Sequence, residues 1–146
     1  MKKNSILFAA LVLITLPALQ SQGVIAGDFE VIVNSSVKDL SLTKDEIKQI
    51  FLTNKLVWSD KSDVKIVAMS PDAPQADDVD KEYMGMTALQ AKKFWLTKVF
   101  NNVLHGQPPL ADTADEVAEK VASTPGAIAA VPKGTKLGSA KVLEIK

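Results

Sequence analysis

The chain of 146 residues contains no cysteine and no arginine, and it has a single histidine. Without cysteine there is no disulfide bond, no thiol nucleophile and no lipid-modified cysteine. Without arginine the chain lacks the planar, bidentate group that usually recognises phosphate and carboxylate. Its 17 basic residues, all lysine, are matched by 17 acidic residues, so the basic footprint of a nucleic-acid-binding protein is absent. We therefore expect no nucleic-acid partner and no thiol chemistry.

Motifs that carry catalytic chemistry are also scarce. His105 has no second histidine and no acid at a helical offset with which it could hold a metal. Nucleophilic catalysis needs a base beside a serine or threonine, and neither a glycine-rich phosphate loop nor a GxSxG motif is present. We expect no enzyme activity, no metal and no cofactor. We assign His105 to the end of a helix, where a cation is favourable, and the acidic residues 77–82 to a solvated helix start.

The first 26 residues have the organisation of a secretory signal peptide. Lys2 and Lys3 precede an apolar run over residues 6–16, which is too short for a confident membrane span. Two segments after this run fit a small-residue cleavage signal. Ser21-Gln22-Gly23 would place the cleavage after Gly23, and Val24-Ile25-Ala26 would place it after Ala26. We expect a periplasmic or secreted protein that is not a lipoprotein and has no membrane span after cleavage. Residues 27–146 are then long enough to form one domain.

Threonine followed three residues later by glutamate or glutamine is the capping-box pattern, and it occurs at Thr43, Thr87 and Thr113. Each predicts the start of a helix. The helix from Thr87 is the most apolar, and Gly106 is expected to supply the left-handed residue at its end. The residues expected on its inward face are Ala91, Trp95, Leu96, Val99, Phe100 and Val103. A short helix is also expected near residues 75–83.

Short runs rich in β-branched and apolar residues predict strands over residues 29–33, 64–69, 127–131 and 141–145. The last run alternates like an edge strand that closes a sheet. Strands separated by helices favour an α/β fold in which helices flank a mixed sheet.

Polar residues follow two of these strands, at positions where α/β proteins commonly place ligands. Asn34, Ser35 and Ser36 follow the first strand, and Ser70 follows the second, on what could be the same rim. Such residues are also ordinary turn formers. Trp58, in the polar loop of residues 55–63, is either a lid over the core or an exposed contact residue. We favour this loop as a partner-binding surface because aromatic residues often anchor interfaces.

Four blocks, in this order, resemble the phosphate-binding subfamily of periplasmic solute-binding proteins, which serve phosphate ABC transporters. They are the strand running into Asn34-Ser35-Ser36; Ile50-Phe51-Leu52 with Lys55 and Trp58-Ser59-Asp60; Phe94-Trp95 and Val99-Phe100 through Gly106-Gln107-Pro108-Pro109; and Val121 with Pro125-Gly126-Ala127-Ile128. Members of this family have two lobes, and this chain has room for one. The resemblance therefore implies a single α/β lobe, half of a type II periplasmic binding protein.

The resemblance further implies a ligand such as phosphate or another small oxyanion, bound in connection with transport. Asn34, Ser35, Ser36 and Ser70 would donate hydrogen bonds to it. The family's Ser-Gly-Thr turn is replaced here by residues 69–74, in which only Ser70 matches. A second hypothesis is therefore a ligand-free interaction module for a periplasmic or envelope protein. A lone lobe also leaves one face uncovered, so self-association is a further expectation.

Overall fold

The structure, a computed structural model, describes residues 28–146, so the predicted signal peptide lies outside the described part of the chain. The helices are α1 (Lys44–Phe51), α2 (Ala76–Met84), α3 (Ala88–Phe100) and α4 (Ala114–Ser123). The strands are β1 (Phe29–Val33), β2 (Ser41–Leu42), β3 (Lys65–Ile66), β4 (Ala68–Met69), β5 (Leu110–Ala111), β6 (Ala127–Pro132) and β7 (Lys141–Ile145). Within the described residues, no helix is long and apolar enough to cross a membrane.

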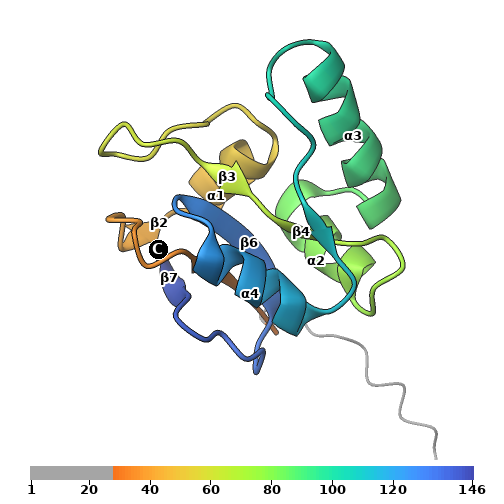
Figure 1. The fold of residues 1–146 in the computed structure, drawn as a ribbon. Helices are drawn as coiled ribbons and strands as arrows, with labels where there is room; N and C mark the ends of the chain where they lie inside the picture. Colours follow the sequence, from red (N-terminus) through yellow and green to blue (C-terminus); the bar gives the residue numbers. More distant parts are fainter. Residues whose placement is uncertain (1–27) are drawn as a thin grey trace, which may run out of the picture.

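A five-stranded mixed sheet forms the centre of the fold, in the strand order β2-β7-β1-β6-β3 (Figure 1). Strand β1 is antiparallel to both β6 and β7, whereas β3 is parallel to β6. Strands β4 and β5 pair in parallel as a separate small sheet. The predicted α/β lobe with a mixed sheet flanked by helices is confirmed.

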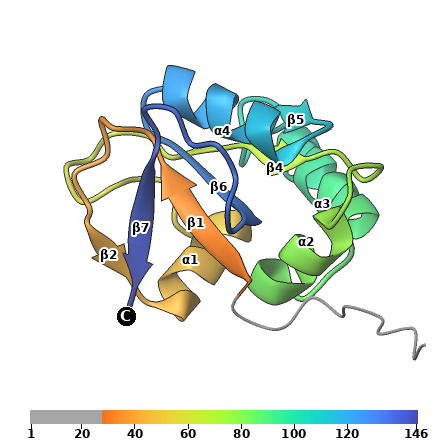
Figure 2. The ribbon, with the colours of Figure 1, turned by 90° about the horizontal axis from the view of Figure 1, so that it is seen from below.

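The central strands are covered on both faces. Val31, Ile32 and Val33 are all fully buried, and consecutive strand residues point to opposite faces of a sheet. Helix α4 packs against β6 and β1, and α2 also contacts β6. Figure 2 shows α4 on one side of the central strands and α1 and α2 on the other. The β-branched residues that predicted β1 therefore form the middle of the core.

Two strand predictions need correction. The run over residues 64–69 divides at Val67, because β3 pairs with β6 while β4 pairs with β5. Strand β7 has the predicted bounds but is not an edge strand. The two residues of β2 pair with it in parallel and form that edge of the sheet instead. The pairing of β4 with β5 and that of β2 with β7 join segments far apart in the chain, so the local hydrophobic pattern cannot predict them.

The capping boxes at Thr43 and Thr87 are both formed, with reciprocal hydrogen bonds to Glu46 and Gln90. Thr113 caps α4 by accepting from the Glu116 N–H, but the Glu116 carboxylate accepts from the N–H of Asp112. All three predicted helix starts are confirmed, because the contacts that define them lie within four residues of one another.

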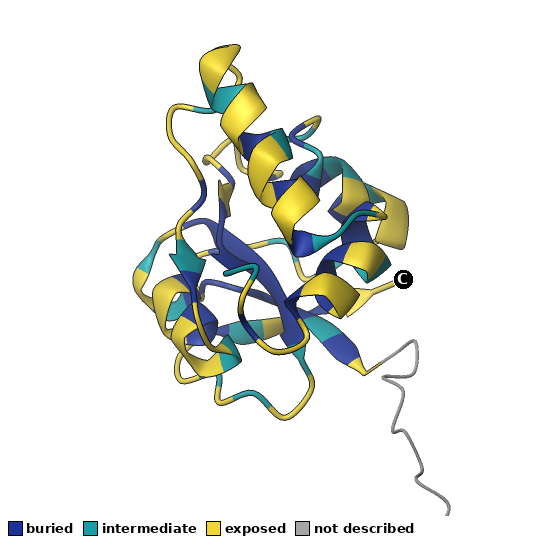
Figure 3. Ribbon diagram, turned by 90° about the vertical axis from the view of Figure 1, so that its right-hand side faces the viewer, coloured by how far each residue is buried: buried dark blue, intermediate teal, exposed yellow. Residues whose placement is uncertain are grey.

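The predicted end of α3 at Gly106 is wrong. The helix ends at Phe100, and Asn102 takes the left-handed conformation with φ of 57°, which asparagine tolerates better than most residues. His105 therefore lies in the following loop, outside any helix. Of the predicted inward face, Ala91 and Trp95 are buried, but Phe100 is 77% exposed. Figure 3 shows α3 extending away from the sheet, with most of its outer half exposed.

Candidate ligand-binding site

The polar residues after β1 lie against the carboxyl end of α4. Asn34 is buried, and its Nδ2 donates to the carbonyl oxygens of Val121 and Ala122 at 2.8 and 2.9 Å. Its Oδ1 accepts from the N–H of Ser36 at 2.9 Å. The Asn34 side chain thus satisfies carbonyl groups that the end of a helix leaves without partners. Its donors are already used within the protein, which argues against the predicted contact with a ligand.

Replacing Asn34 with alanine is expected to lower the free energy of unfolding by about 2–3 kcal/mol, because two carbonyl groups at a helix end lose their donor. Ser35→Ala is the matched control, since Ser35 is exposed and its replacement should change stability by less than about 0.5 kcal/mol. Urea denaturation of both variants measures the difference. Equal stability of the two would show that the Asn34 cap contributes nothing.

Ser70 does not share a rim with Asn34. Because β1 is antiparallel to β6 and β3 is parallel to β6, the segment leading to Ser70 runs opposite to β1. The carboxyl end of β1 therefore lies near the start of β3: the Asn34 N–H donates to Ala127 O, and the Lys65 N–H donates to Gly126 O. Ser70 follows the other end, beyond β4. The expectation of one rim for the four predicted residues is wrong.

At its own end of the structure, Ser70 lies beside the starts of two helices. Strands β4 and β5 are parallel, and the Ser70 N–H donates to Ala111 O at 2.7 Å. Helix α2 follows β4 and helix α4 follows β5, so both helix N-termini belong to this edge of the small sheet. The N-cap residue of α2, Gln75, makes no side-chain cap. The Ala76 N–H donates to Ala73 O, so in the first turn of α2 the N–H groups of Asp77 and Asp78 are the ones available to an anion.

The electrostatics of this edge oppose strong anion binding. Asp72 lies between β4 and α2, and Asp77 and Asp78 lie in the first turn of α2; all three are exposed. One Asp77 carboxylate oxygen accepts from the Ala88 N–H at 2.9 Å, which ties the start of α3 to α2. We expect these acids to repel a doubly charged anion more than a singly charged one.

Trp58 is a core residue. Its side chain is 2% exposed, and the indole Nε1 donates to Gly126 O at 2.9 Å. The alternative in which the ring is a lid over the core is therefore right. An exposed anchor for a partner is wrong, because the bond to Gly126 turns the polar edge of the indole inward.

The assignment of the acidic residues 77–82 to a solvated helix start is wrong for Asp80, which is a buried acid on α2. Removal from water, with a smaller effect of the Asp77 charge, raises the pKa of Asp80 to about 7. The residue borders a small cavity together with Phe51, Met69 and Trp95. Its helical spacing from the buried residues Ala76 and Tyr83 was the available signal.

Taken together, the fold is that of one lobe of a periplasmic-type solute-binding protein. A solved structure with a similar fold is an ABC-type phosphate transport receptor from Vibrio cholerae, with a TM-score of 0.61. The match covers 81% of this chain and 46% of the receptor, at 11% sequence identity, so this chain spans about half of that protein. No family model and no curated protein matches the sequence. At this identity the likeness establishes the fold alone.

Proposed function

We propose that this protein is an exported solute-binding lobe that holds a small oxyanion such as phosphate at the edge where β4 and β5 end. The observation that carries the proposal is the likeness of the lobe to a phosphate transport receptor. The uncapped first turn of α2 supports it by offering N–H donors, and the Ser70 hydroxyl lies at the same edge. The N-terminal signal-peptide pattern supports a place outside the cytoplasm.

The absence of arginine and the presence of acids near the site both lower the affinity that we expect. Without a bidentate cation, binding depends on neutral donors, and Asp72 and Asp77 weaken it. We expect a dissociation constant in the millimolar range for the lobe alone. A second lobe, supplied by another protein, would close the site from the other side and tighten binding.

Phosphate is expected to raise the melting temperature saturably, because a ligand of the native state stabilises it. Ser70→Ala should weaken binding about threefold, through loss of one neutral hydrogen bond. Ser35→Ala is the matched control and should leave binding unchanged, since Ser35 lies at the other end of the sheet. Chloride at equal ionic strength controls for salt. A response shared by phosphate and chloride would refute oxyanion binding here.

A second candidate function, an interaction module for an envelope protein, is favoured by the surface of α3. Leu89, Leu96 and Phe100 are 50%, 40% and 77% exposed and are spaced to lie on one face of the helix. Lys92 and Lys93 are also exposed on this helix, which contains no acidic residue. Such a surface fits a partner that offers apolar side chains flanked by acidic ones.

Phe100→Ser is expected to abolish a specific cross-link between this protein and a partner in an envelope fraction, without lowering the melting temperature. Leu40→Ser is the matched control, because Leu40 is 74% exposed and lies outside α3. Loss of the cross-link in both variants, or in neither, would count against α3 as the docking surface. Sedimentation of the purified protein separates a foreign partner from a second copy of the chain.

A further inference from the structure

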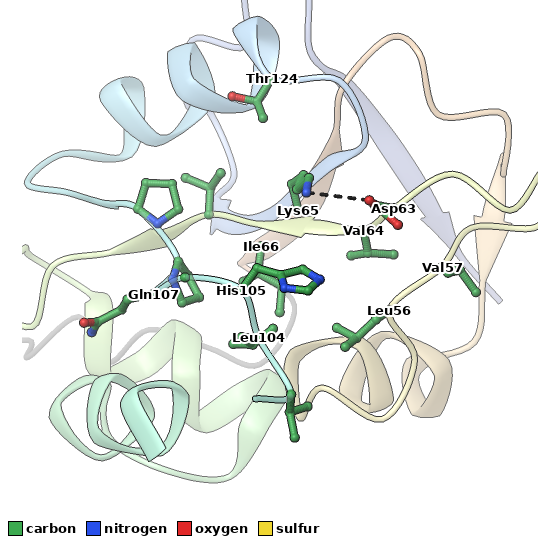
Figure 4. A pocket seen from close by; sticks show the side chains of 15 residues that line it. Leu56, Val57, Asp63, Val64, Lys65, Ile66, Leu104, His105, Gln107 and Thr124 are labelled. Atoms are coloured by element: carbon green, nitrogen blue, oxygen red, sulfur yellow. Dashed lines mark ion pairs between the residues drawn. The ribbon is translucent and has the colours of Figure 1, made fainter. Parts of the chain in front are cut away.

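A cavity of about 490 Å³ lies between strand β3 and two loops, at residues 56–57 and residues 103–109 (Figure 4). This volume is within the range of about 300–1,000 Å³ that is typical of small-ligand sites. The second loop forms a wall of the cavity only because α3 ends at Phe100. The cavity is separate from the edge near Ser70, since it adjoins the start of β3 and the carboxyl end of α4 at Thr124.

Two backbone hydrogen bonds hold the two loops apart. The Val64 N–H donates to Leu56 O at 2.9 Å, and the Ala68 N–H donates to Pro109 O at 3.1 Å. Four residue steps of extended chain lie between these attachments, which corresponds to about 13 Å. Ile66, between them, is only 5% exposed, so a ligand here meets side chains and not the backbone of β3. The space is long enough for a molecule of one or two fused rings.

The lining of the cavity is mainly apolar. Figure 4 shows the side chains of Leu56, Ile66 and Leu104 around it. Val57 and Val103 also line it and are 45% and 40% exposed, so the rest of the protein leaves part of this apolar surface uncovered. An apolar ligand that covers these side chains removes them from water, which favours its binding.

The charges at the margin of the cavity compensate each other. The side chains of Asp63 and Lys65 are both exposed and form an ion pair at 3.8 Å. A charged ligand would lose part of its hydration on entering the cavity, and the cation or anion that it meets already has a partner. The cavity therefore favours an uncharged ligand.

Rings and polar side-chain atoms narrow the choice of ligand further. The rings of His105, Pro108 and Pro109 line the cavity, and a flat ligand can contact the face of a ring with many atoms at once. The side chains of His105, Gln107 and Thr124 add polar atoms to the lining. Within residues 28–146 these three side chains make no hydrogen bond, so they can accept one from a ligand.

We propose that this cavity binds a small, uncharged aromatic molecule that has one or two fused rings and one hydrogen-bonding group. Its ring packs against the apolar side chains and the imidazole of His105, and its polar group bonds to one of the polar side chains of the lining. The site shares no residue with the edge near Ser70, so it does not depend on oxyanion binding there.

Indole is the probe, because it is uncharged, has two fused rings and carries one N–H group. His105 is the only histidine, so its imidazole resonances in the untagged protein need no assignment. Indole is expected to shift them saturably, with a dissociation constant on the order of 0.1–1 mM. Indole-3-acetate adds a carboxylate and should bind roughly fivefold more weakly. Unshifted histidine resonances, or affinity for indole-3-acetate equal to that for indole, would overturn the proposal.

Val103→Trp tests the location independently. Because Val103 lines the cavity and is partly exposed, a larger side chain is expected to fill the cavity with little loss of stability. Indole should then bind roughly tenfold more weakly. Val142→Trp is the matched control at an exposed valine on β7, and it should leave binding unchanged. Unchanged binding to Val103→Trp, with its melting temperature retained, would overturn the proposal.

Two more variants complete the test. Val57→Trp fills the cavity from the other loop and replaces Val103→Trp if that variant does not fold, with the same expected loss of binding. Ser70→Ala should leave indole binding unchanged, since Ser70 lies outside the cavity. Weaker indole binding by Ser70→Ala would contradict two separate sites. Phosphate binding is measured without indole, so the failure of one proposal leaves the other to its own experiment.

Discussion

Gly126→Ala is expected to lower the free energy of unfolding by about 3–5 kcal/mol, the largest loss that we expect from any single methyl group in this protein. Gly126 has a φ of +77°, in the left-handed region that costs an alanine about 1–2 kcal/mol. A Cβ at this position would also lie 2.3 Å from Asp63 O, which is far inside van der Waals contact. The loss exceeds the conformational cost because backbone must move.

The surroundings of Gly126 leave little room for such a movement. Its carbonyl oxygen accepts from Trp58 Nε1 and from the Lys65 N–H, and its own N–H donates to Ser36 Oγ. Three separate segments therefore converge on this one residue. A displacement large enough to relieve the contact with Asp63 would lengthen at least one of these bonds.

Gly134→Ala is the matched control for this prediction. Gly134 has a φ of +87°, but a Cβ there would meet nothing within 4 Å, so only the conformational cost of about 1–2 kcal/mol applies. Urea denaturation of the two variants separates the two effects. If both lose the same stability, the close approach of Asp63 to Gly126 is not a constraint, and the prediction fails.

Asp80→Asn is expected to stabilise the protein at pH 8 by roughly 2–4 kcal/mol, because a tenfold change in an acid dissociation constant corresponds to about 1.4 kcal/mol. Burial is the main reason that the pKa of Asp80 rises from 3.8 to about 7. The folded protein binds this proton more tightly than the unfolded chain does. The contribution of Asp80 to stability is therefore fully present below about pH 4 and is lost as the pH rises through about 7. Asparagine removes the charge that causes this loss.

The difference between the wild-type protein and Asp80→Asn should accordingly grow between pH 4 and pH 8. Burial raises the pKa of Tyr83, the aromatic neighbour on the same helix, to about 12, so Tyr83 titrates outside this window. Asp78→Asn is the matched control, because Asp78 is an exposed acid on α2. Denaturation curves at several pH values provide the measurement. A difference that does not change with pH would show that the Asp80 carboxylate stays hydrated in the folded state.

The ligand site illustrates why local patterns were an incomplete guide. Asn34 and Ser70 both follow strands, and that is all the sequence reports about their positions. Whether two strand ends meet depends on the direction in which the strands pair, and β1 runs opposite to β3. The loop that follows α3 was hidden for a related reason, because the apolar spacing through Val103 continues past the actual end of the helix at Phe100. The spacing of apolar residues cannot show that Trp95 is the last buried residue of α3.

By itself the sequence determined where three helices begin, at Thr43, Thr87 and Thr113, and which residues form β1 and β7. Those features depend on capping bonds and alternation within a few residues. Only the tertiary structure decided that Trp58 faces Gly126 and that Asn34 closes α4, through bonds between residues 68 and 87 positions apart. Likewise, it alone gave Asp80 its raised pKa. Each of these features depends on which distant segments exclude water from a residue or form a hydrogen bond with it. The local sequence does not specify those segments.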